Sequence, residues 1–158
     1  WLTEPGLLPE TPNPVSPLLG AVDEQVARWR DARSSDVLTT AQWSTQEWLH
    51  FLGAIAGDLD RAGMADLDRR FALTTSGNAE ILCVWLRLSI QHEYEAANGA
   101  LRQFLTNIGR RKFLTPLYKE LMKTPTGQTN AREIYRTARG RYHYVARGTI
   151  DGIVGWNE

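Results

Sequence analysis

The sequence is poor in cysteine and in long apolar runs. Its 158 residues include one cysteine, Cys83, so no disulfide can form within the chain. Cys83 lies in the run ILCVWL, where a free cysteine usually serves as a small buried side chain. No run of about 18 apolar residues could span a membrane, and the first residues lack the pattern of a signal peptide. We expect a soluble chain with no membrane partner; the cytoplasm is favoured, and the sequence is also compatible with the periplasm or secretion.

Signals of β-structure are missing as well. The sequence has no β-hairpin turn and no glycine-rich βαβ turn, whereas apolar residues recur at spacings of three and four after Pro17. The positions that define the expected helices are Leu18, Leu19, Val22, Val26 and Trp29; Trp48, Leu49, Leu52 and Ile55; Met64, Leu67 and Phe71; residues 81–90; Tyr94, Ala97, Leu101, Phe104, Leu105 and Ile108; residues 113–122; residues 129–138; and residues 145–154. The sequence predicts an all-α fold of about eight or nine helices stacked in pairs, without a clean repeat period.

Several residues predict where these helices begin and end. Ser44 and Glu47 have the spacing of a capping box, and Asn78 is a candidate N-cap for the segment ILCVWLRLSI. This segment is apolar nearly all round, which predicts a central helix. Gly109 is expected to close the preceding helix at its C′ position. Pro116 is compatible with the next helix only if it lies near the first turn.

The N-terminal segment differs from the rest in composition. The chain begins with Trp1 rather than Met, and the following residues TEPGLLPETPNPVSP are rich in proline. Proline fixes φ and removes a backbone donor, as in linkers and extended entry segments. We expect residues 1–14 to be a linker from another domain and residues 15–158 to be the helical domain.

Charge is divided unevenly along the chain although the formal total is zero. Residues 1–101 carry 7 Lys and Arg against 14 Asp and Glu, whereas residues 102–158 carry 11 against 4. The stretch RTARGRYHYVAR would suit phosphates and bases, but the neutral total and the absence of a nucleic-acid-binding motif argue against nucleic acid as a partner. An acidic protein partner and the acidic half of the same chain are the remaining candidates for the basic half.

No catalytic or metal-binding constellation is evident in the sequence. The string HEYEA at residues 92–96 resembles the start of the zinc motif H-E-x-x-H, but Ala96 stands where the second histidine is needed. His92 and Glu93 are therefore expected to lie at a solvated helix start. His50 and His143 have no cysteine or carboxylate at metal-ligand spacing around them. We expect no catalytic residue and no metal within this chain.

One basic cluster lies at an electrostatically unfavourable position. Arg110, Arg111 and Lys112 follow Gly109 and precede the apolar run FLTPLY, so they lie at the start of a predicted helix. Cations there oppose the helix dipole and cost a few tenths of a kcal/mol or more per charge unless something offsets them. The negative end of the preceding helix is one candidate for that offset, and a bound anion is another.

Three strings together resemble a known family. WLTEPGLLPETPN, NAEILCVWLRLSIQHEYEAA and FLTNIGRRKFLTPLYKEL, in this order and spacing, resemble the C-terminal helical domain of leukotriene A4 hydrolase and its bacterial aminopeptidase relatives. The most specific parts are the tryptophan-containing central helix and the string G-R-x-K-F-x-x-P-L-Y/F. Many members have a His-Pro pair near the end, where this chain has His143 and Tyr144.

The resemblance implies a fold, a function and a site. Family members are zinc aminopeptidases, some of which also hydrolyse a fatty-acid epoxide, and their C-terminal domain is an armadillo-like right-handed superhelix that closes one side of the active-site cleft. Zinc and the catalytic residues would then belong to a catalytic domain outside this chain, with which the helical domain would associate. The Arg and Lys of the family string hold the carboxylate of a peptide substrate, and they correspond to Arg110 and Lys112. Arg111, between them, is expected to point to solvent or to the neighbouring domain.

Two functions therefore remain open. In the first, the chain is the helical domain of a zinc aminopeptidase and binds the substrate's carboxylate without being catalytic by itself. In the second, it is an autonomous helical scaffold that binds an acidic protein partner through its basic C-terminal half.

Overall fold

The computed structural model describes residues 17–157, and all regular secondary structure in this part of the chain is helical. The predicted all-α fold is confirmed, whereas the expected linker at residues 1–14 lies outside the described residues. None of the helices described is long and apolar enough to cross a bilayer. The eight α-helices are α1 (Pro17–Ala32), α2 (Thr45–Ile55), α3 (Arg61–Phe71), α4 (Ala79–Gln91), α5 (Asn98–Asn107), α6 (Arg111–Leu121), α7 (Pro125–Ala138) and α8 (Tyr144–Val154).

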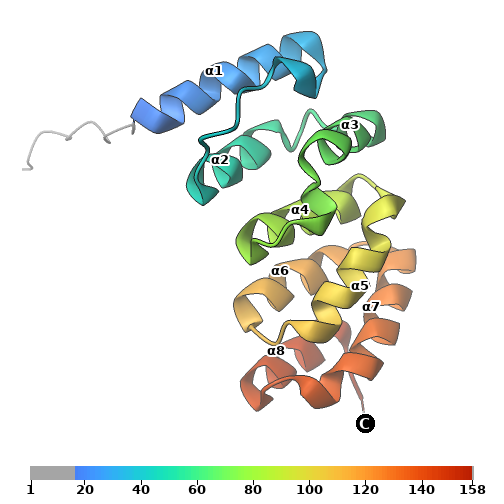
Figure 1. Ribbon diagram of the computed structural model, residues 1–158. Helices are drawn as coiled ribbons and strands as arrows, with labels where there is room; N and C mark the ends of the chain where they lie inside the picture. The colour runs from blue at the N-terminus through green and yellow to red at the C-terminus, as the bar shows by residue number, and fades with distance from the viewer. Residues whose placement is uncertain (1–16, 158) are drawn as a thin grey trace, which may run out of the picture.

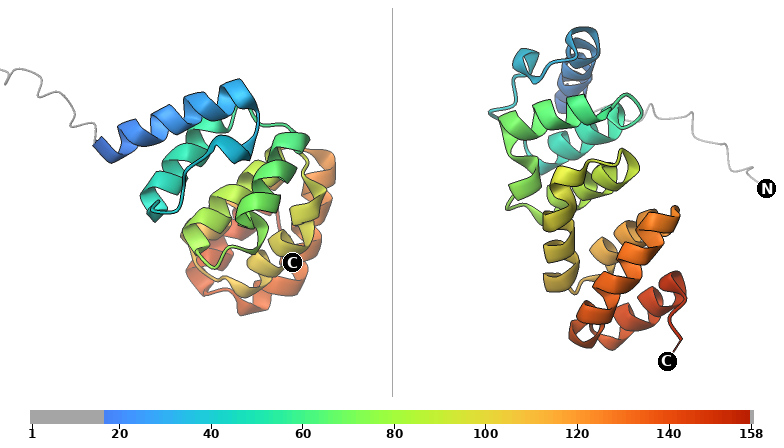
Figure 2. Two further views of the ribbon diagram at one scale, coloured as in Figure 1. Left: turned by 45° about the horizontal axis from the view of Figure 1, so that its top comes forward. Right: turned by 90° about the vertical axis from the view of Figure 1, so that its right-hand side faces the viewer.

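The helices form an elongated stack with α1 at one end and α8 at the other (Figure 1). Helices α2, α4, α6 and α8 each pack on the next of the series, and α5 packs on α7. The views in Figure 2 show the same layered arrangement from two other directions. Successive helices of the α2 to α8 series begin 34, 32 and 33 residues apart. The starts of this series are therefore nearly periodic along the chain, although the residue types show no clean repeat.

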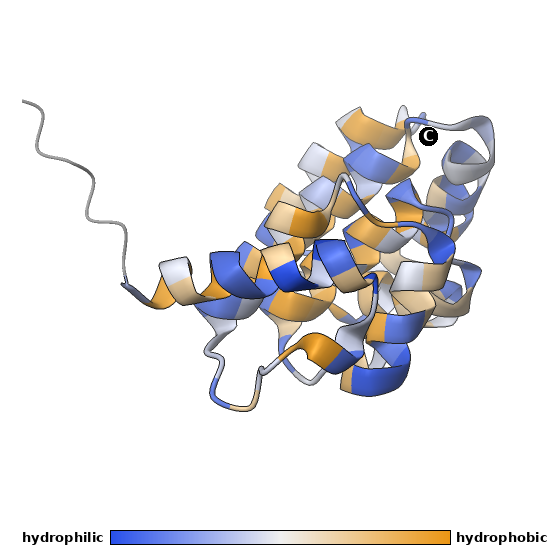
Figure 3. Ribbon diagram, turned by 90° about the horizontal axis from the view of Figure 1, so that it is seen from above, coloured by the Kyte–Doolittle hydropathy of each residue, from blue (hydrophilic) through white to orange (hydrophobic). Residues whose placement is uncertain are grey.

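Two hydrophobic cores share α4. The first core is built by α1 to α4 and receives Ile81, Trp85 and Leu88 from α4. The second core is built by α4 to α8 and receives Cys83 and Leu86 from the same helix. Hydrophobic residues run in stripes along the helices, with hydrophilic residues between them (Figure 3). Because α4 buries opposite sides in different cores, it has to be apolar nearly all round, and the predicted central position is confirmed.

The predicted N-caps are confirmed at α2 and α4. The Ser44 side chain accepts from the Glu47 N–H, and the Glu47 carboxylate accepts from the Ser44 N–H at 2.7 Å, which makes a reciprocal capping box. These bonds hold the pKa of Glu47 below its usual range. The Asn78 side chain accepts from the N–H groups of the second and third residues of α4. Each cap satisfies backbone donors that have no partner within the helix.

Three boundaries differ from the sequence-based expectation. Helix α5 ends at Asn107 and Ile108 is already extended, so the chain leaves the helix before Gly109, which does not adopt the positive φ expected of a C′ glycine. Helix α6 begins at Arg111, which places Pro116 in the second turn rather than near the first. Helix α7 begins four residues earlier than the apolar pattern indicated, because Thr124 caps it and Pro125 occupies its first position.

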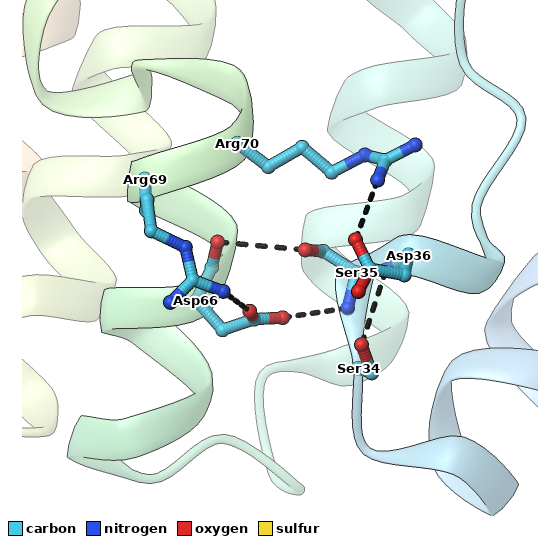
Figure 4. A network of polar contacts seen from close by, with 6 residues as sticks. All are labelled: Ser34, Ser35, Asp36, Asp66, Arg69 and Arg70. Carbon is cyan, nitrogen blue, oxygen red and sulfur yellow. Dashed lines mark hydrogen bonds and ion pairs between the residues drawn. The ribbon is translucent and has the colours of Figure 1, made fainter.

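A polar network that the sequence did not predict joins the segment after α1 to α3. This segment contains a short 3₁₀ turn, Ser35–Val37. The Asp66 carboxylate accepts from the Ser35 N–H at 2.6 Å and pairs with Arg69, while Arg70 pairs with Asp36 at 2.7 Å (Figure 4). The hydrogen bond from the Ser35 backbone holds the pKa of Asp66 below its usual range. The network ties the connection between α1 and α2 to α3.

Candidate carboxylate-binding site

The start of α6 carries the basic cluster. Arg110 is the N-cap residue in an extended conformation, and its side chain does not cap the helix. The first turn contains no acidic residue. The Phe113 N–H donates to the Arg110 carbonyl at 3.0 Å, whereas the N–H groups of Arg111 and Lys112 have no acceptor among the described residues. This end therefore presents free backbone donors as well as positive charge.

Arg110 and Lys112 converge on one ring. The Arg110 guanidinium carbon lies 5.9 Å from the centre of the Phe113 ring, and the Lys112 ammonium lies 4.9 Å from it. Phe113 itself is buried and contacts Phe104 edge to face, so the ring is fixed in the core. Within residues 17–157, Arg111 contacts neither the ring nor an acidic residue, and its side chain is exposed. Arg110 and Lys112 thus share contact with the Phe113 ring, whereas Arg111 does not contact it.

Lys112 has a partner that the sequence analysis missed. Its ammonium forms an ion pair with the carboxylate of Glu80, in the first turn of α4. The side chains of Lys112 and Glu80 remain 54% and 44% exposed, so an external ligand can reach both. The near-periodic helix starts could have revealed this contact, because Glu80 and Lys112 are each the second residue of their helices.

Further contacts fix the start of α6 against α4 and the start of α4 against α2. The Cys83 thiol donates to the Phe113 carbonyl at 3.6 Å, and burial raises the pKa of this thiol to about 11. The Asn78 amide donates to the Thr45 hydroxyl at 2.8 Å, which joins the first turns of α4 and α2. The starts of α2, α4 and α6 therefore lie side by side along one edge of the stack (Figure 1).

This edge changes its electrostatic character along the stack. The first turns of α2 and α4 contain Glu47 and Glu80, whereas those of α6 and α8 contain no acidic residue. Acidic residues at a helix start offset the dipole. The starts of α6 and α8 lack that offset within their own first turns.

A groove lies next to this edge. It has a volume of about 580 Å³ and runs between the segment before α4 and helix α5. Two residues that line it, Ser76 and Ile108, precede the N-caps of α4 and α6 by two positions. Leu82 and Phe104 provide apolar surface, and Asn107 provides a polar side chain. The groove therefore combines apolar and polar lining and reaches the segments that precede α4 and α6.

The three histidines have separate partners. The His92 ring contacts the Ala56 carbonyl at 2.9 Å, and the string HEYEA lies at the end of α4, not at a helix start as expected. His50 pairs with Asp23 at 2.6 Å, and His143 caps α8. Among residues 17–157, no group of three or more His, Cys, Asp or Glu side chains is arranged to hold a metal ion.

Comparisons with known proteins identify a family and a fold for this chain. The family described as "Leukotriene A4 hydrolase, C-terminal" matches residues 43–154. Human aminopeptidase B is 24% identical over 168 residues, which cover 98% of this chain and 25% of that protein. Mouse aminopeptidase RNPEPL1 is 28% identical over 126 residues, which cover 78% of this chain and 17% of that protein. The chain thus spans about a quarter or less of the length of these curated relatives.

A solved structure shares the fold. The structure of native yeast LTA4 hydrolase matches 95% of this chain and 28% of its own with a TM-score of 0.78, at 16% sequence identity. At this identity the likeness supports the fold alone, while the family match covers well over half of the chain. The chain therefore belongs to the family of leukotriene A4 hydrolase C-terminal domains.

Proposed function

We propose that the chain is the C-terminal domain of a zinc-dependent aminopeptidase, which closes one side of the active-site cleft and binds the substrate's carboxylate. Family membership and the aminopeptidase relatives support this assignment. The zinc ion and the residues that activate water would belong to a catalytic domain outside this chain. The helical domain contributes binding and orientation and is not catalytic by itself.

The observation that carries the proposal is the start of α6. Two cations converge on one buried ring there, beside free backbone donors and without an acidic residue in the first turn. A carboxylate at this end can accept from the N–H groups, from the planar guanidinium of Arg110 in a bidentate manner, and from the ammonium of Lys112. Such a ligand supplies the negative charge that the helix start lacks.

Carboxylate binding at this position orients a peptide by its C-terminal end. When the carboxylate is held there, the position of the first peptide bond depends on the length of the peptide. Only peptides of a matching, short length then place this bond correctly at the catalytic domain. We therefore expect short peptides as the main substrates, and we rank hydrolysis of a fatty-acid epoxide second because it needs additional features. Orientation of this kind lowers the barrier by positioning the scissile bond.

Steady-state kinetics on the full-length protein test the proposal. The variants are Arg110→Ala and Lys112→Ala, and the substrates are a tripeptide and an aminoacyl anilide that has no carboxylate. We expect each variant to lose about 2 kcal/mol of transition-state stabilisation with the tripeptide, about 30-fold in kcat/KM, and almost nothing with the anilide.

Arg111→Ala is the matched control for this experiment. It removes one cation from the same helix turn, but its side chain contacts neither Phe113 nor Glu80. Equal losses with both substrates, or an Arg111→Ala effect as large as the other two, would contradict carboxylate recognition. The cluster would then act through general electrostatics or domain docking.

A second candidate function is favoured by one observation. Within the described part of the basic half, several cations form no ion pair: Arg110, Arg111, Lys119, Arg132, Arg136, Arg141 and Arg147. The acidic half of the chain thus neutralises only part of the basic half, which leaves positive charge for an acidic protein partner. Salt-sensitive binding of this chain to a polyglutamate peptide, lost in Arg136→Glu but retained in Lys112→Ala, would support this function over the first.

A further inference from the structure

We infer that Glu80 is a built-in competitor of the substrate carboxylate for Lys112, and that it sets the affinity of the site. This inference rests on the proposed function of Arg110 and Lys112. Without a ligand, the Glu80 carboxylate occupies the Lys112 ammonium. A peptide carboxylate has to displace it or share the ammonium with a second negative charge, and either alternative weakens binding.

The geometry makes Glu80 displaceable. The Glu80 side chain has no other ion pair or side-chain hydrogen bond in the described part of the chain, and it is 44% exposed. It lies in the first turn of α4, where the helix dipole stabilises a carboxylate even when Lys112 is not beside it. Glu80 can therefore rotate toward solvent at small cost.

A glutamate of α6, Glu120, shows the contrast. Glu120 is 5% exposed and is held by both Arg87 at 3.1 Å and Lys123 at 2.9 Å. Removing one cation from such a buried pair leaves an uncompensated charge. Glu120 is thus part of the fold, whereas Glu80 is exposed and pairs with Lys112 alone among the described residues.

The size of the effect follows from the exposure of the pair. Exposed ion pairs are weak, and the loss of one changes an equilibrium by about two- to fivefold. Replacing Glu80 by glutamine removes the competing charge and retains the shape of the side chain. We therefore expect the Glu80→Gln variant to bind a peptide carboxylate about two- to fivefold more tightly.

Binding of tri-alanine to this chain, followed by backbone amide chemical shifts in the first turn of α6, tests the inference. Tri-alanine amide is the ligand control because it lacks the carboxylate. Glu133→Gln is the matched protein control. Glu133 of α7 forms an ion pair with Arg102 of α5 at 3.0 Å, and this pair is about as exposed as that of Glu80 and Lys112. We expect tighter binding of tri-alanine in Glu80→Gln, no change in Glu133→Gln, and weak or no binding of the amide throughout.

Salt separates competition from a structural role of Glu80. The Debye length falls to about 3 Å at about 1 M salt, so the advantage of Glu80→Gln over the wild type should shrink toward unity there. A change of helix structure in the variant would persist at high salt.

The outcomes distinguish this inference from the proposed function. If Lys112→Ala and Arg110→Ala bind tri-alanine as well as the wild type does, the proposed function fails. If these variants bind more weakly but Glu80→Gln binds no more tightly than the wild type, only the inference fails, and Glu80 then positions Lys112 instead of competing for it. If neither the wild type nor Glu80→Gln gives saturable shifts, the inference is also overturned, because a freed Lys112 then has no measurable affinity for a carboxylate.

Discussion

Among the glycines of the described chain, Gly127 is the one whose replacement by alanine should destabilise the fold most clearly. It is the third residue of α7, directly after the tight connection from α6. A Cβ atom added there would lie 2.0 Å from the Leu121 carbonyl oxygen and 2.8 Å from the Thr124 hydroxyl. The oxygen of Leu121 is backbone at the end of α6, so it cannot rotate away. The connection between α6 and α7 therefore has to shift to make room for the Cβ atom.

The magnitude can be worked out from three contributions. Overpacking of this kind costs about 1–3 kcal/mol. The hydrogen bond from the Gly127 N–H to the Thr124 hydroxyl, 3.1 Å long, caps α7, and its loss costs about 1 kcal/mol more. The higher helix propensity of alanine returns about 1 kcal/mol. The net destabilisation of Gly127→Ala is therefore about 2 kcal/mol, which corresponds to a Tm lower by about 4–8 °C for a chain of this size.

Thermal and urea unfolding followed by far-UV circular dichroism measure this effect. Gly148→Ala is the control, because Gly148 lies inside α8 and an added Cβ meets nothing within 4 Å. The same substitution should there stabilise the chain by about 0.5–1 kcal/mol. A Gly127→Ala variant as stable as the wild type, or stabilised like Gly148→Ala, would refute the reasoning about the α6–α7 connection.

Two further predictions concern titratable groups. The hydrogen bond from Arg139 holds the pKa of Asp151 below its ordinary value of 3.8, so the stability that Asp151 contributes is present above that pH and is lost as the pH falls through the depressed pKa. Asp151→Asn should lower the unfolding free energy by about 1–2 kcal/mol near neutral pH. In acid, the unfolding free energies of the variant and the wild type should become similar. A difference between them that stays constant down to acid pH would contradict this. Burial raises the pKa of the Cys83 thiol from 9.0 to about 11, so a thiol reagent at about pH 8 should react about 100-fold more slowly with folded than with unfolded chain; equal rates would show that Cys83 is accessible as thiolate.

The parts of the fold that depend on neighbours in sequence were predictable. The capping box at Ser44 and the N-cap at Asn78 involve residues within one turn of each other, and both are present. The central position of α4 followed from the absence of a polar face on that helix, because an all-round apolar helix has to be covered on more than one side.

The features that depend on distant contacts were not predictable in the same way. The ion pair of Glu80 with Lys112 and the hydrogen bond of Ser35 with Asp66 join residues 32 and 31 positions apart. Gly109 was expected to end α5 by a left-handed conformation, but Ile108 ends the helix by extending. Local propensity identifies a helix boundary there, while the packing of α6 on α4 decides the direction in which the chain leaves.

The basic cluster lies where the helix starts along the edge of the stack change from acidic to basic. Helix starts at α2 and α4 satisfy their donors with Ser44 and Asn78 and offset their dipoles with glutamates. At α6 the chain provides neither a side-chain cap nor an acidic residue of the same turn, and its nearest anion, Glu80, belongs to α4 and meets only Lys112. In the part of the chain that the structure describes, Arg110 has no acidic partner, although a single acidic residue in the first turn would have offset the dipole. An end that is unsatisfied in this way is unfavourable for an isolated domain and favourable for one that binds a carboxylate there.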